Sequence, residues 1–400
     1  MKAFYRLYRS ACVLFSVIAF FVLTFFVFFQ PYHVNYYLPK NSANVKSEDS
    51  NPYETFQKSL RHRVPQRAVH QLVKHVYPPR RNMEECKPLF GRIGIFVAVN
   101  TDHGDKLYKI AQASLQCYLK STPYKYFYID IDKDVRTLGR CNQTNVYYKR
   151  HCVAAHYLHE VDWMLFLDGD IGVVNPNHCV EEWIDDRVDM IFYERFFKLM
   201  KNTEKSKRFL LDFANMEYEQ FEGFTGYDNG VLQILILQAA LPGAIAEIKA
   251  CDAIYKRSKT LEQYYNYVTC VKLQLGASRV FPGSVRIYRR AHGWARDSKL
   301  AGNKWSDSDF MFHSWKASEL NSTWFDADVF TKIPNPKKCS RSLNEWNHRP
   351  ELHVQTDLIK QELSAYETGI AQGYPKEGRD IPHLMEPDVR ECYPDCDKYT

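Results

Sequence analysis

Residues 163–176 read WMLFLDGDIGVVNP. An uninterrupted apolar run, WMLFL, leads into two aspartates, Asp168 and Asp170, which are separated by a single glycine and followed by a second apolar stretch. A short run that is apolar at every position predicts a strand buried on both faces, as in a parallel sheet covered by helices on both sides. The two carboxylates then lie at the carboxyl edge of that sheet, where α/β proteins bind their ligands.

The chain around this stretch alternates between strand and helix patterns. IGIFVAV (93–99) and YFYIDI (126–131) have the composition of strands, as does VDMIFY (188–193). Residues 105–119 carry an apolar stripe at helical spacing, and a second helical stretch covers about 146–160. This alternation predicts an α/β fold with a mostly parallel sheet flanked by helices.

The two aspartates indicate a cation site. Adjacent carboxylates repel each other unless a cation or a proton lies between them, and Mn²⁺ or Mg²⁺ prefers such oxygen ligands. These ions commonly link one or two carboxylates to substrate phosphates, which suggests a phosphate-bearing ligand. Gly169 is expected to let the backbone turn tightly between the aspartates. The alternative is an ordinary Asp-Gly-Asp surface turn.

The first 90 residues predict a membrane anchor and a stem. Residues 11–29 contain no charge and, at about 1.5 Å per residue, would span roughly 28 Å as a helix, close to the thickness of a bilayer core. The basic residues before them place a cytosolic tail at 1–10 and the rest of the chain across the membrane, as a single-pass type II protein with a signal-anchor. A cleaved signal peptide is the alternative. Residues 30–90 have the Pro-containing, polar and basic composition of a stem.

Cysteines and sequons agree with an oxidising lumen. Ten cysteines follow the expected membrane helix, an even number that permits disulfide bonds without revealing their connectivity. The chain has no CxxC pair, which disfavours a zinc site. Asn142 and Asn321 begin glycosylation sequons. The formal charge of +6 is small for 400 residues and gives no indication of nucleic-acid binding.

The stretch WMLFLDGDIGVVNP resembles the donor-site segment of glycosyltransferases with the GT-A nucleotide-sugar-binding fold, specifically the galactosyl/mannosyltransferase family. In that family a hydrophobic strand runs into Asp-x-Asp, further apolar residues and Asn-Pro. Three more stretches follow in the family's order: YDNGVLQILIL (227–237) is similar to a strand that lines the sugar site, FPGSVRIY (281–288) to the segment leading to the final strands, and SDFMFH (308–313) to a strand ending in a metal-binding histidine. The whole chain also resembles a nematode family known as domain of unknown function 273.

The resemblance covers roughly 91–320 and implies a catalytic domain over 91–335. The section from 336 to 400 is polar with Pro-rich spacing, and we expect it to be a C-terminal extension attached to the domain. The resemblance also implies that Asp168, Asp170 and His313 bind Mn²⁺ (or Mg²⁺) and the nucleotide-sugar. An imidazole is an acceptable Mn²⁺ ligand among carboxylates. His292 is the alternative to His313, and for His313 an ordinary structural role is the competing interpretation.

Positive groups are needed where the diphosphate leaves, because negative charge grows there as the bond to the sugar breaks. Lys316 is a candidate, together with Arg289, Arg290 and Arg296, although a solvated charge run is the alternative for each arginine. The family follows its histidine with a small, glycine-containing stretch, whereas this chain has Ser314-Trp315-Lys316. The contacts to the diphosphate therefore differ here from those of the family.

The Asp-Asn-Gly triplet consists of Asp228, Asn229 and Gly230. It puts polar groups in an otherwise apolar region, the kind of place where side chains approach a ligand. Asp228 is the candidate catalytic residue: it could bind sugar hydroxyls, lie behind the anomeric carbon or act as the base of an inverting reaction. Asn229 and Gly230 are expected to contribute to donor binding. The alternative is an Asp-Asn-Gly turn.

The sequence therefore predicts a Golgi glycosyltransferase, dependent on a metal ion, that transfers a hexose from a nucleotide-sugar donor to a glycan or glycoprotein acceptor. The resemblance favours retention of anomeric configuration. One alternative is a non-catalytic protein with a glycosyltransferase-like fold that binds glycans or acts as a membrane scaffold. The other is a phosphatase of the haloacid-dehalogenase type, in which the first aspartate would be the nucleophile. That class carries Asp-x-Asp near the start of its domain, whereas here about 75 residues of the domain precede the motif.

Overall fold

The computed structural model describes residues 86–101, 107–193, 198–276, 278–288, 291–316, 329–339 and 343–372, all within one compact unit, Gln66–Thr400. In this part of the chain no helix is long and apolar enough to cross a membrane. Several sequence predictions concern residues outside the described ranges: the tail (1–10), the membrane helix (11–29) and the stem as far as residue 85, together with Arg289, Arg290, Asn321, Cys392 and Cys396.

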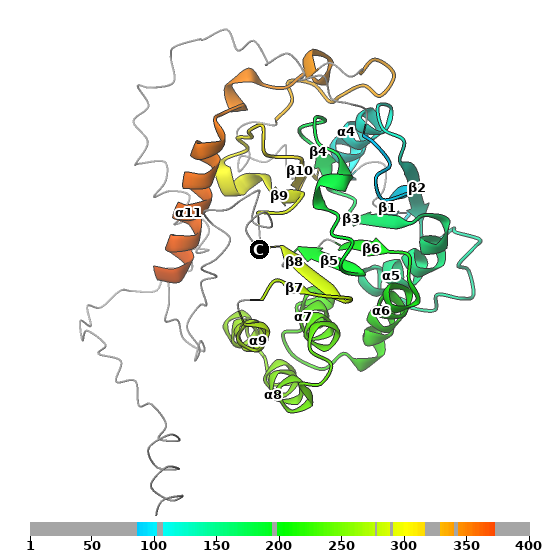
Figure 1. Ribbon diagram of the computed structural model, residues 1–400, viewed down its shortest axis with the longest axis vertical. Helices are drawn as coiled ribbons and strands as arrows, with labels where there is room; N and C mark the ends of the chain where they lie inside the picture. The colour runs from blue at the N-terminus through cyan, green and yellow to red at the C-terminus, as the bar shows by residue number, and fades with distance from the viewer. Residues whose placement is uncertain are drawn as a thin grey trace, which may run out of the picture. The chain divides into compact units, whose positions relative to one another are not determined.

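The centre of the described part is a seven-stranded sheet with the order β2-β1-β3-β6-β5-β8-β7 (Figure 1). All four predicted strands are present. Strands β1 (Ile93–Val99) and β3 (Trp163–Leu167) have the predicted bounds, and the bounds of β2 and β5 differ from the prediction by one or two residues. The other bounds are β2, Lys125–Asp130; β5, Met190–Tyr193; β6, Lys198–Lys201; β7, Val280–Phe281; and β8, Val285–Tyr288.

The prediction of a mostly parallel sheet is wrong in part, because the sheet is mixed. The pairs β1–β2, β1–β3 and β5–β8 are parallel, whereas β3–β6, β5–β6 and β7–β8 are antiparallel. Strand β6 follows β5 after a short connection, and such a connection can join only antiparallel neighbours. Because β6 then inserts between β3 and β5, it also runs antiparallel to β3.

Helices cover both faces of this sheet, and the strand residues alternate between two cores. Ile95 and Val97 pack in one core with α4, while Phe96 packs in the other with α5, α6 and α7. This double covering is why β1 and β3 are apolar at every position. The helix bounds are α4, Lys109–Leu119; α5, Val146–Tyr157; α6, Glu204–Asn215; α7, Tyr227–Ala240; α8, Ile245–Lys256; α9, Leu261–Leu275; and α11, Thr356–Gln372.

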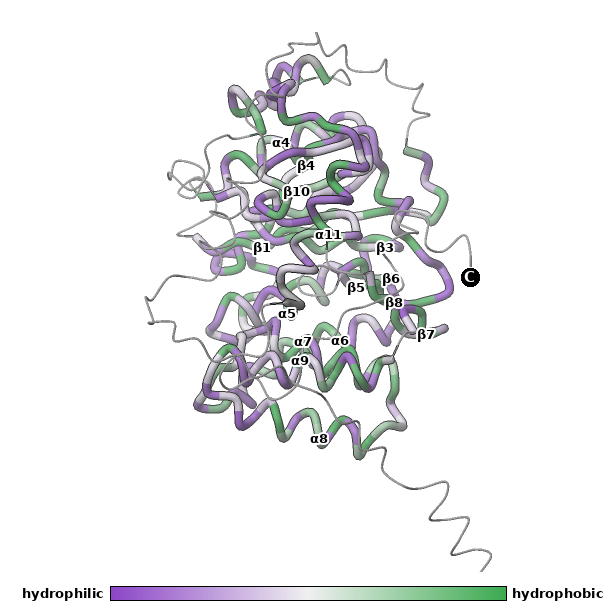
Figure 2. The backbone as a smooth tube through the Cα atoms, turned by 90° about the vertical axis from the view of Figure 1, so that its left-hand side faces the viewer, coloured by the Kyte–Doolittle hydropathy of each residue, from purple (hydrophilic) through white to green (hydrophobic). Residues whose placement is uncertain are grey.

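The segment 227–237 forms the first part of helix α7, so its expected assignment as a strand is wrong. Val231, Leu235 and Ile236 pack toward the sheet, while Ile234 and Leu237 join a third core with α8 and α9. A helix buried on two sides is apolar all round, and such a run cannot be distinguished from a buried strand by periodicity. Helix α8 is more peripheral and alternates between hydrophobic and hydrophilic residues along its length (Figure 2).

Short 3₁₀ helices connect these elements, at η2, Leu158–Glu160; η3, Val180–Trp183; η4, Met216–Glu219; η5, Ser298–Ala301; η6, Leu343–Trp346; and η7, Pro350–Leu352. Helix α11 contacts η5, and the Lys304 ammonium lies 2.9 Å from the Glu362 carboxylate of α11. The C-terminal section therefore contributes a packed helix, which its polar composition did not predict.

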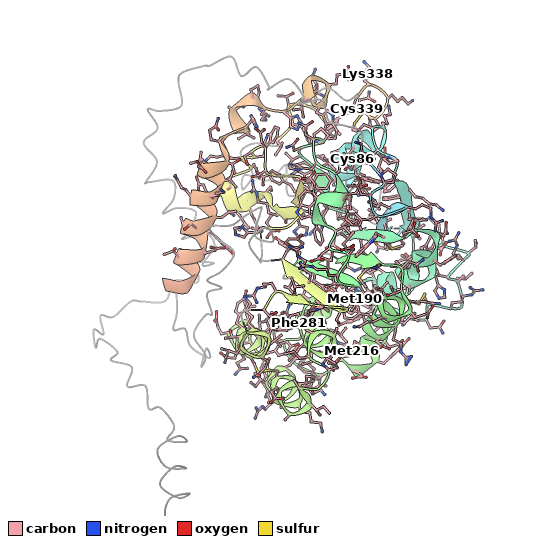
Figure 3. All side chains as sticks on the ribbon, viewed as in Figure 1. Cys86, Met190, Met216, Phe281, Lys338 and Cys339 are labelled. Carbon is pink, nitrogen blue, oxygen red and sulfur yellow. A yellow bond between two sulfur atoms is a disulfide. The ribbon has the colours of Figure 1, made fainter. Side chains whose placement is uncertain are left out.

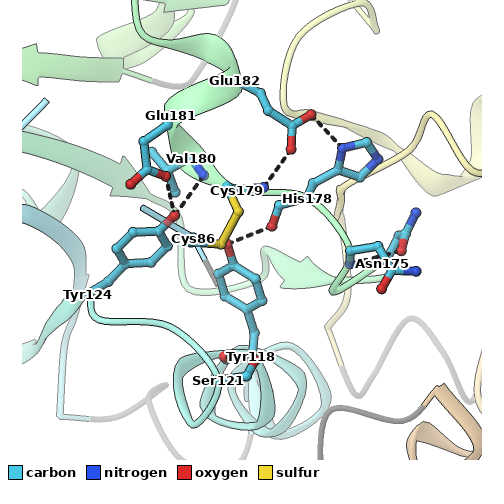
Figure 4. Close-up of a disulfide and its surroundings, with 11 residues drawn as sticks. Cys86, Tyr118, Ser121, Tyr124, Asn175, His178, Cys179, Val180, Glu181 and Glu182 are labelled. Atoms are coloured by element: carbon cyan, nitrogen blue, oxygen red, sulfur yellow. Dashed lines mark hydrogen bonds and ion pairs between the residues drawn. A yellow bond between two sulfur atoms is a disulfide. The ribbon is translucent and has the colours of Figure 1, made fainter. Parts of the chain in front are cut away.

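Four disulfide bonds join described cysteines: Cys86–Cys179, Cys117–Cys339, Cys141–Cys152 and Cys251–Cys270. Around the first of them, the Tyr118 hydroxyl donates to the carbonyl of His178 at 2.8 Å (Figure 4). The second joins α4 to the C-terminal section, and Cys339 lies near that helix (Figure 3). These bonds agree with the oxidising compartment expected from the cysteine count.

The Cys117–Cys339 bond closes the longest loop, across 222 residues, whereas Cys141–Cys152 spans 11. In the chain-entropy model these loops correspond to about 5 and about 3 kcal/mol of stability. We therefore expect Cys117→Ala with Cys339→Ala to lower the free energy of unfolding more than Cys141→Ala with Cys152→Ala. Urea denaturation of the oxidised proteins measures the difference. An equal or smaller loss for the longer loop would contradict this prediction.

Candidate metal and donor site

A second, three-stranded sheet brings the predicted metal ligands together. Its strands are β4 (Gly172–Val173), β9 (Ala295–Asp297) and β10 (Met311–His313), in the order β4-β10-β9. Strand β4 starts two residues after Asp170 and pairs with β10, which ends at His313. The expected strand at 308–313 forms only over Met311–His313, but it ends at the predicted histidine, and the pairing brings that histidine to the end of β3.

Asp168, Asp170 and His313 each direct one potential ligand atom to a common point, and these atoms all lie within 4.8 Å of one another. His313 Nε2 is 3.5 Å from a carboxylate oxygen of Asp170. On the other side of the ring, Nδ1 lies 2.5 Å from Asp297 Oδ1, because β9 and β10 pair in the register that sets these two residues opposite each other. Asp297 therefore orients the imidazole so that Nε2 faces the aspartates.

The carboxylates of this cluster change the pKa of His313. Burial opposes protonation of His313, but the carboxylates of Asp170 and Asp297 outweigh it and raise the pKa of the imidazole to about 9. Lys316 adds a second cation, with its Nζ 3.6 Å from Asp170 Oδ2. Asp170 therefore faces two positive groups, His313 at the end of strand β10 and Lys316 just after it.

Both glycines of the motif are required by close neighbours. A Cβ on Gly169 would lie 2.5 Å from the ring of Tyr108, and one on Gly172 would lie 2.5 Å from the ring of Trp315. The expected tight turn is present, because Gly169 and Asp170 form a turn in which the Ile171 N–H donates to the carbonyl of Asp168 at 3.1 Å. The φ of Gly169 lies outside the left-handed region, so the turn alone does not require glycine. Glycine is required at both positions because the neighbouring aromatic ring leaves no room for a Cβ.

The Ser314-Trp315-Lys316 segment, in which this chain departs from the galactosyl/mannosyltransferase pattern, has a clear structure. Ser314 adopts φ +74°, a conformation that glycine would adopt more readily. Trp315 is fully buried, and its backbone N–H donates to the carbonyl of Asp170 at 3.0 Å. This hydrogen bond fixes the chain beside the motif and brings Lys316 to Asp170.

Arg150 of helix α5 is a site residue that the sequence did not reveal. One guanidinium nitrogen lies 2.5 Å from Asp168 Oδ1, and another lies 2.5 Å from Asp228 Oδ2. Burial opposes the charge of Arg150, but both carboxylates favour it and keep its pKa above the usual value. Arg150 thereby connects the Asp-x-Asp motif to the start of α7.

Asp228 is 3% exposed and lies in the first turn of α7. Burial would raise its pKa, yet Arg150 and His151 hold the pKa of this carboxyl well below its usual range. His151 Nε2 is 3.6 Å from the Asp228 carboxylate, and its ring stacks on Phe213 at 3.9 Å. The expected catalytic aspartate is thus part of a buried ion-pair network.

Lys198, in β6, is fully buried beside this network. Its Nζ lies 4.6 Å from the ring centroid of Phe213 and 4.9 Å from that of Phe166. Burial lowers the pKa of Lys198 to about 7, and the nearby charge of Arg150 acts in the same direction. A lysine in an otherwise apolar core gives no signal in a sequence read for periodicity.

The remaining predicted residues do not converge on the aspartates. The Arg296 guanidinium binds Asp309 at 2.5 Å and the carbonyl of Lys304, within the fold. His292 Nε2 faces Glu367 of α11 at 3.5 Å, so His292 does not replace His313 as the candidate ligand. Gly230 is buried within α7, and its carbonyl accepts a hydrogen bond from Tyr267. Asn229 lies beside Asp228 in the first turn of the same helix.

Asn142, the sequon asparagine within the described residues, is exposed beside the Cys141–Cys152 disulfide. An exposed position is required for glycosylation, so the structure leaves this prediction open to a direct test.

The model of the family "Protein of unknown function, DUF273" matches residues 115–327, which include Arg150, the two aspartates and His313. The chain belongs to this family. No curated protein matches it in sequence. Among 11 matching chains of solved structures is a glycosyltransferase involved in the glycosylation of the major capsid of PBCV-1, with 12% identity and a TM-score of 0.31. That match covers 56% of this chain and 92% of the other.

The Arg150–Asp228 pair predicts a large cost on removal of one partner. We expect Asp228→Asn to lower the free energy of unfolding by about 3 kcal/mol at pH 7, because it leaves a buried guanidinium partly uncompensated. The folded-state pKa of Asp228 is below its unfolded value of about 3.9, so its stabilisation is present above pH 4 and is lost as the pH falls. Urea denaturation at pH 7, 5 and 3 measures both effects.

Asp212→Asn is the matched control for this prediction. Asp212 is an exposed helix carboxylate 3.9 Å from Arg208, a pair worth less than about 0.5 kcal/mol. If both variants lost equal stability, or if the wild type and Asp228→Asn had the same slope between pH 5 and 3, the assigned network would be wrong.

The lowered pKa of Lys198 predicts a second pH dependence of the unfolding free energy, which comes from a cation and not from a carboxylate. Its folded-state pKa of about 7 is lower than the unfolded value of about 10.4, so the unfolded chain binds more protons between these pH values and stability rises with pH. Lys198→Met should remove this slope, which is at most about 1.4 kcal/mol per pH unit. The measurement is the difference in unfolding free energy between wild type and variant at pH 6.5, 8 and 9. A constant difference would refute the lowered pKa.

Proposed function

We propose that the protein is a metal-dependent glycosyltransferase with a GT-A-like fold, which transfers a hexose from a nucleotide-sugar to a glycan or glycoprotein acceptor. The observation that carries this proposal is the convergence of Asp168, Asp170 and His313, from two separate strands, with ligand atoms within 4.8 Å of one another. These residues follow the resemblance noted in the sequence, and they meet at the carboxyl end of β3, the edge where α/β sheets bind ligands.

The donor set suits Mn²⁺ or Mg²⁺. Two carboxylates and one imidazole form a hard, mixed oxygen and nitrogen set, and Asp297 holds the imidazole in a fixed orientation. Asp168, Asp170 and His313 would hold the ion, which when bound supplies positive charge to a diphosphate. Without a bound ion, the negative charge of two carboxylates this close together is compensated only by positively charged side chains of the protein.

Lys316 is the group we assign to the leaving diphosphate. Its ammonium reaches Asp170, and its side chain is 37% exposed, so it borders the aspartates and is also open to a ligand. As the sugar–phosphate bond breaks, negative charge grows on the diphosphate, and an ammonium already positioned there stabilises the transition state more than the ground state.

Asp228 is better suited to hold Arg150 than to abstract a proton. Its lowered pKa makes it a weak base, and its carboxylate is engaged by Arg150 and His151. Asp228 is therefore a poor base for an inverting reaction, and the resemblance noted in the sequence favours retention of configuration. We therefore assign Asp228 the role of orienting Arg150 toward Asp168.

The compartment we propose is the Golgi lumen, with residues 11–29 as the signal-anchor. Four disulfides among the described residues support an oxidising environment. The apolar, uncharged composition of 11–29 supports the anchor.

One observation favours the alternative of a non-catalytic, glycosyltransferase-like scaffold. Arg150, Lys316 and a protonated His313 already provide cations for the two aspartates, so the cluster is partly compensated without a metal ion. The phosphatase alternative is weaker, because the carboxylate that would be its nucleophile, Asp168, is bound by Arg150, and the sheet is not parallel throughout.

Calorimetry on the full chain distinguishes these functions. A panel of nucleoside diphosphates and nucleotide-sugars is titrated with Mn²⁺ or with EDTA. We expect Mn²⁺-dependent binding of one nucleotide, reduced at least about tenfold in Asp170→Asn, since even changes around metal ligands cost that much. Asp162→Asn, an exposed carboxylate that pairs with Arg92 before β3, is the matched control. Absence of nucleotide binding by the folded wild type would refute the transferase.

A further inference from the structure

Two exposed tyrosines pack together beside the site. Tyr147, in the first turn of α5, is 44% exposed, and Tyr227, the first residue of α7, is 59% exposed. Their ring centroids are 5.4 Å apart with an angle of 34° between the planes. Large aromatic side chains that are exposed side by side form a contiguous apolar surface, the kind of feature that marks binding sites when it is extensive.

The backbone of Tyr227 adopts an unfavourable conformation. Tyr227 has φ +51° and follows Gly226 at φ +64°, so two successive residues occupy the left-handed region. For a bulky residue this conformation is rare and persists where the surrounding structure imposes it, often at functional sites. Here the Tyr227 amide donates to Thr225 Oγ1 at 3.1 Å, and the helix that follows is buried between two cores.

The tyrosine pair is continuous with the Asp-x-Asp motif through Arg150. The Arg150 guanidinium carbon lies 5.8 Å from the Tyr147 ring centroid, and the same guanidinium binds Asp168. Tyr227 directly precedes Asp228, which binds Arg150 from the other side. The two rings thus lie near the motif at the start of α5 and the start of α7, whereas His313 ends strand β10 and Lys316 follows it.

The chemistry of this surface matches a pyranose ring. A pyranose has C–H groups on one face that pack on an aromatic ring, and hydroxyls around its rim that hydrogen-bond to polar groups. A tyrosine offers an aromatic face together with a hydroxyl, and is suited to a ligand that is apolar on one side and wet on the other. The two tilted rings provide the apolar contact.

We propose that Tyr147 and Tyr227 form the surface on which a pyranose ring of the acceptor glycan packs. This inference rests on the proposed function, which assigns the diphosphate to the Asp170, His313 and Lys316 side of the motif. The acceptor then reaches the transferred sugar from the part of the motif next to Arg150 and the tyrosine pair.

The test uses ligand-observed NMR titrations of the full chain with four probes: the methyl glycosides of galactose, mannose, glucose and N-acetylglucosamine, in a detergent without a sugar headgroup. We expect at least one probe to bind, with affinity reduced about fivefold or more in Tyr147→Ala and in Tyr227→Ala, because the stacking surface is lost. Tyr147→Phe and Tyr227→Phe keep the rings and should stay within about twofold of the wild type.

Tyr218→Ala, which removes an exposed tyrosine outside the pair, is the matched control and should leave probe binding unchanged. Probe binding should also persist when the protein is saturated with the nucleoside diphosphate and Mn²⁺, since the two ligands would occupy different sides of the motif. Mn²⁺–nucleotide affinity should be the same in the four tyrosine-pair variants as in the wild type.

Each other outcome rejects the inference in a distinct way. If no probe binds, or if the alanine variants bind as the wild type does, the tyrosine pair is not a sugar surface. If the nucleotide displaces the probe and the alanine variants bind nucleotide weakly, the pair belongs to the donor site. If probe binding depends on both rings but the wild type binds no nucleotide, the transferase and the acceptor role fail while the sugar surface stands.

Discussion

The charge of two carboxylates at the end of a buried strand is the constraint on which the site depends. Asp168 and Asp170 follow β3 with little access to solvent, so each must be compensated by the protein or by an ion. The two aspartates are compensated from different directions. Asp168 binds Arg150 of α5, whereas Asp170 faces His313 and Lys316 after β10. Helix α5 and strand β10 must therefore both lie beside the motif, because each supplies the cations for one of the two aspartates.

The same division explains why the small sheet and helix α7 matter. Strand β4 pairs with β10 and so brings His313 to the motif, and β9 adds Asp297 behind the imidazole. Asp228, at the start of α7, binds the second terminal nitrogen of the Arg150 guanidinium. Segments more than 100 residues apart in sequence therefore meet around one tripeptide.

The sequence predicted the features that depend on local pattern. Strands β1 and β3 have the expected bounds, because a continuous apolar run flanked by polar residues is a strong signal, and the terminal histidine of β10 was found through family order. What it missed depends on tertiary packing. The apolar run in α7 has no periodicity because both sides are buried, and β6 disturbs the parallel order through a short connection. Arg150 and Lys198 were missed because burial of a charge is decided by partners that are distant in sequence.

The amount of buried charge is difficult to explain by stability alone. A buried ion pair is often no more stabilising than apolar residues of the same volume, because desolvation offsets the attraction between the charges. Here Arg150, Asp228, His151 and Lys198 lie together beside the rings of Phe166 and Phe213, and the pKa of each is shifted from its usual value. Shifted pKa values of this kind concentrate at functional sites. A fold selected only for stability would favour apolar side chains at these positions. Under the proposed function, the network is the support that holds Asp168 in place.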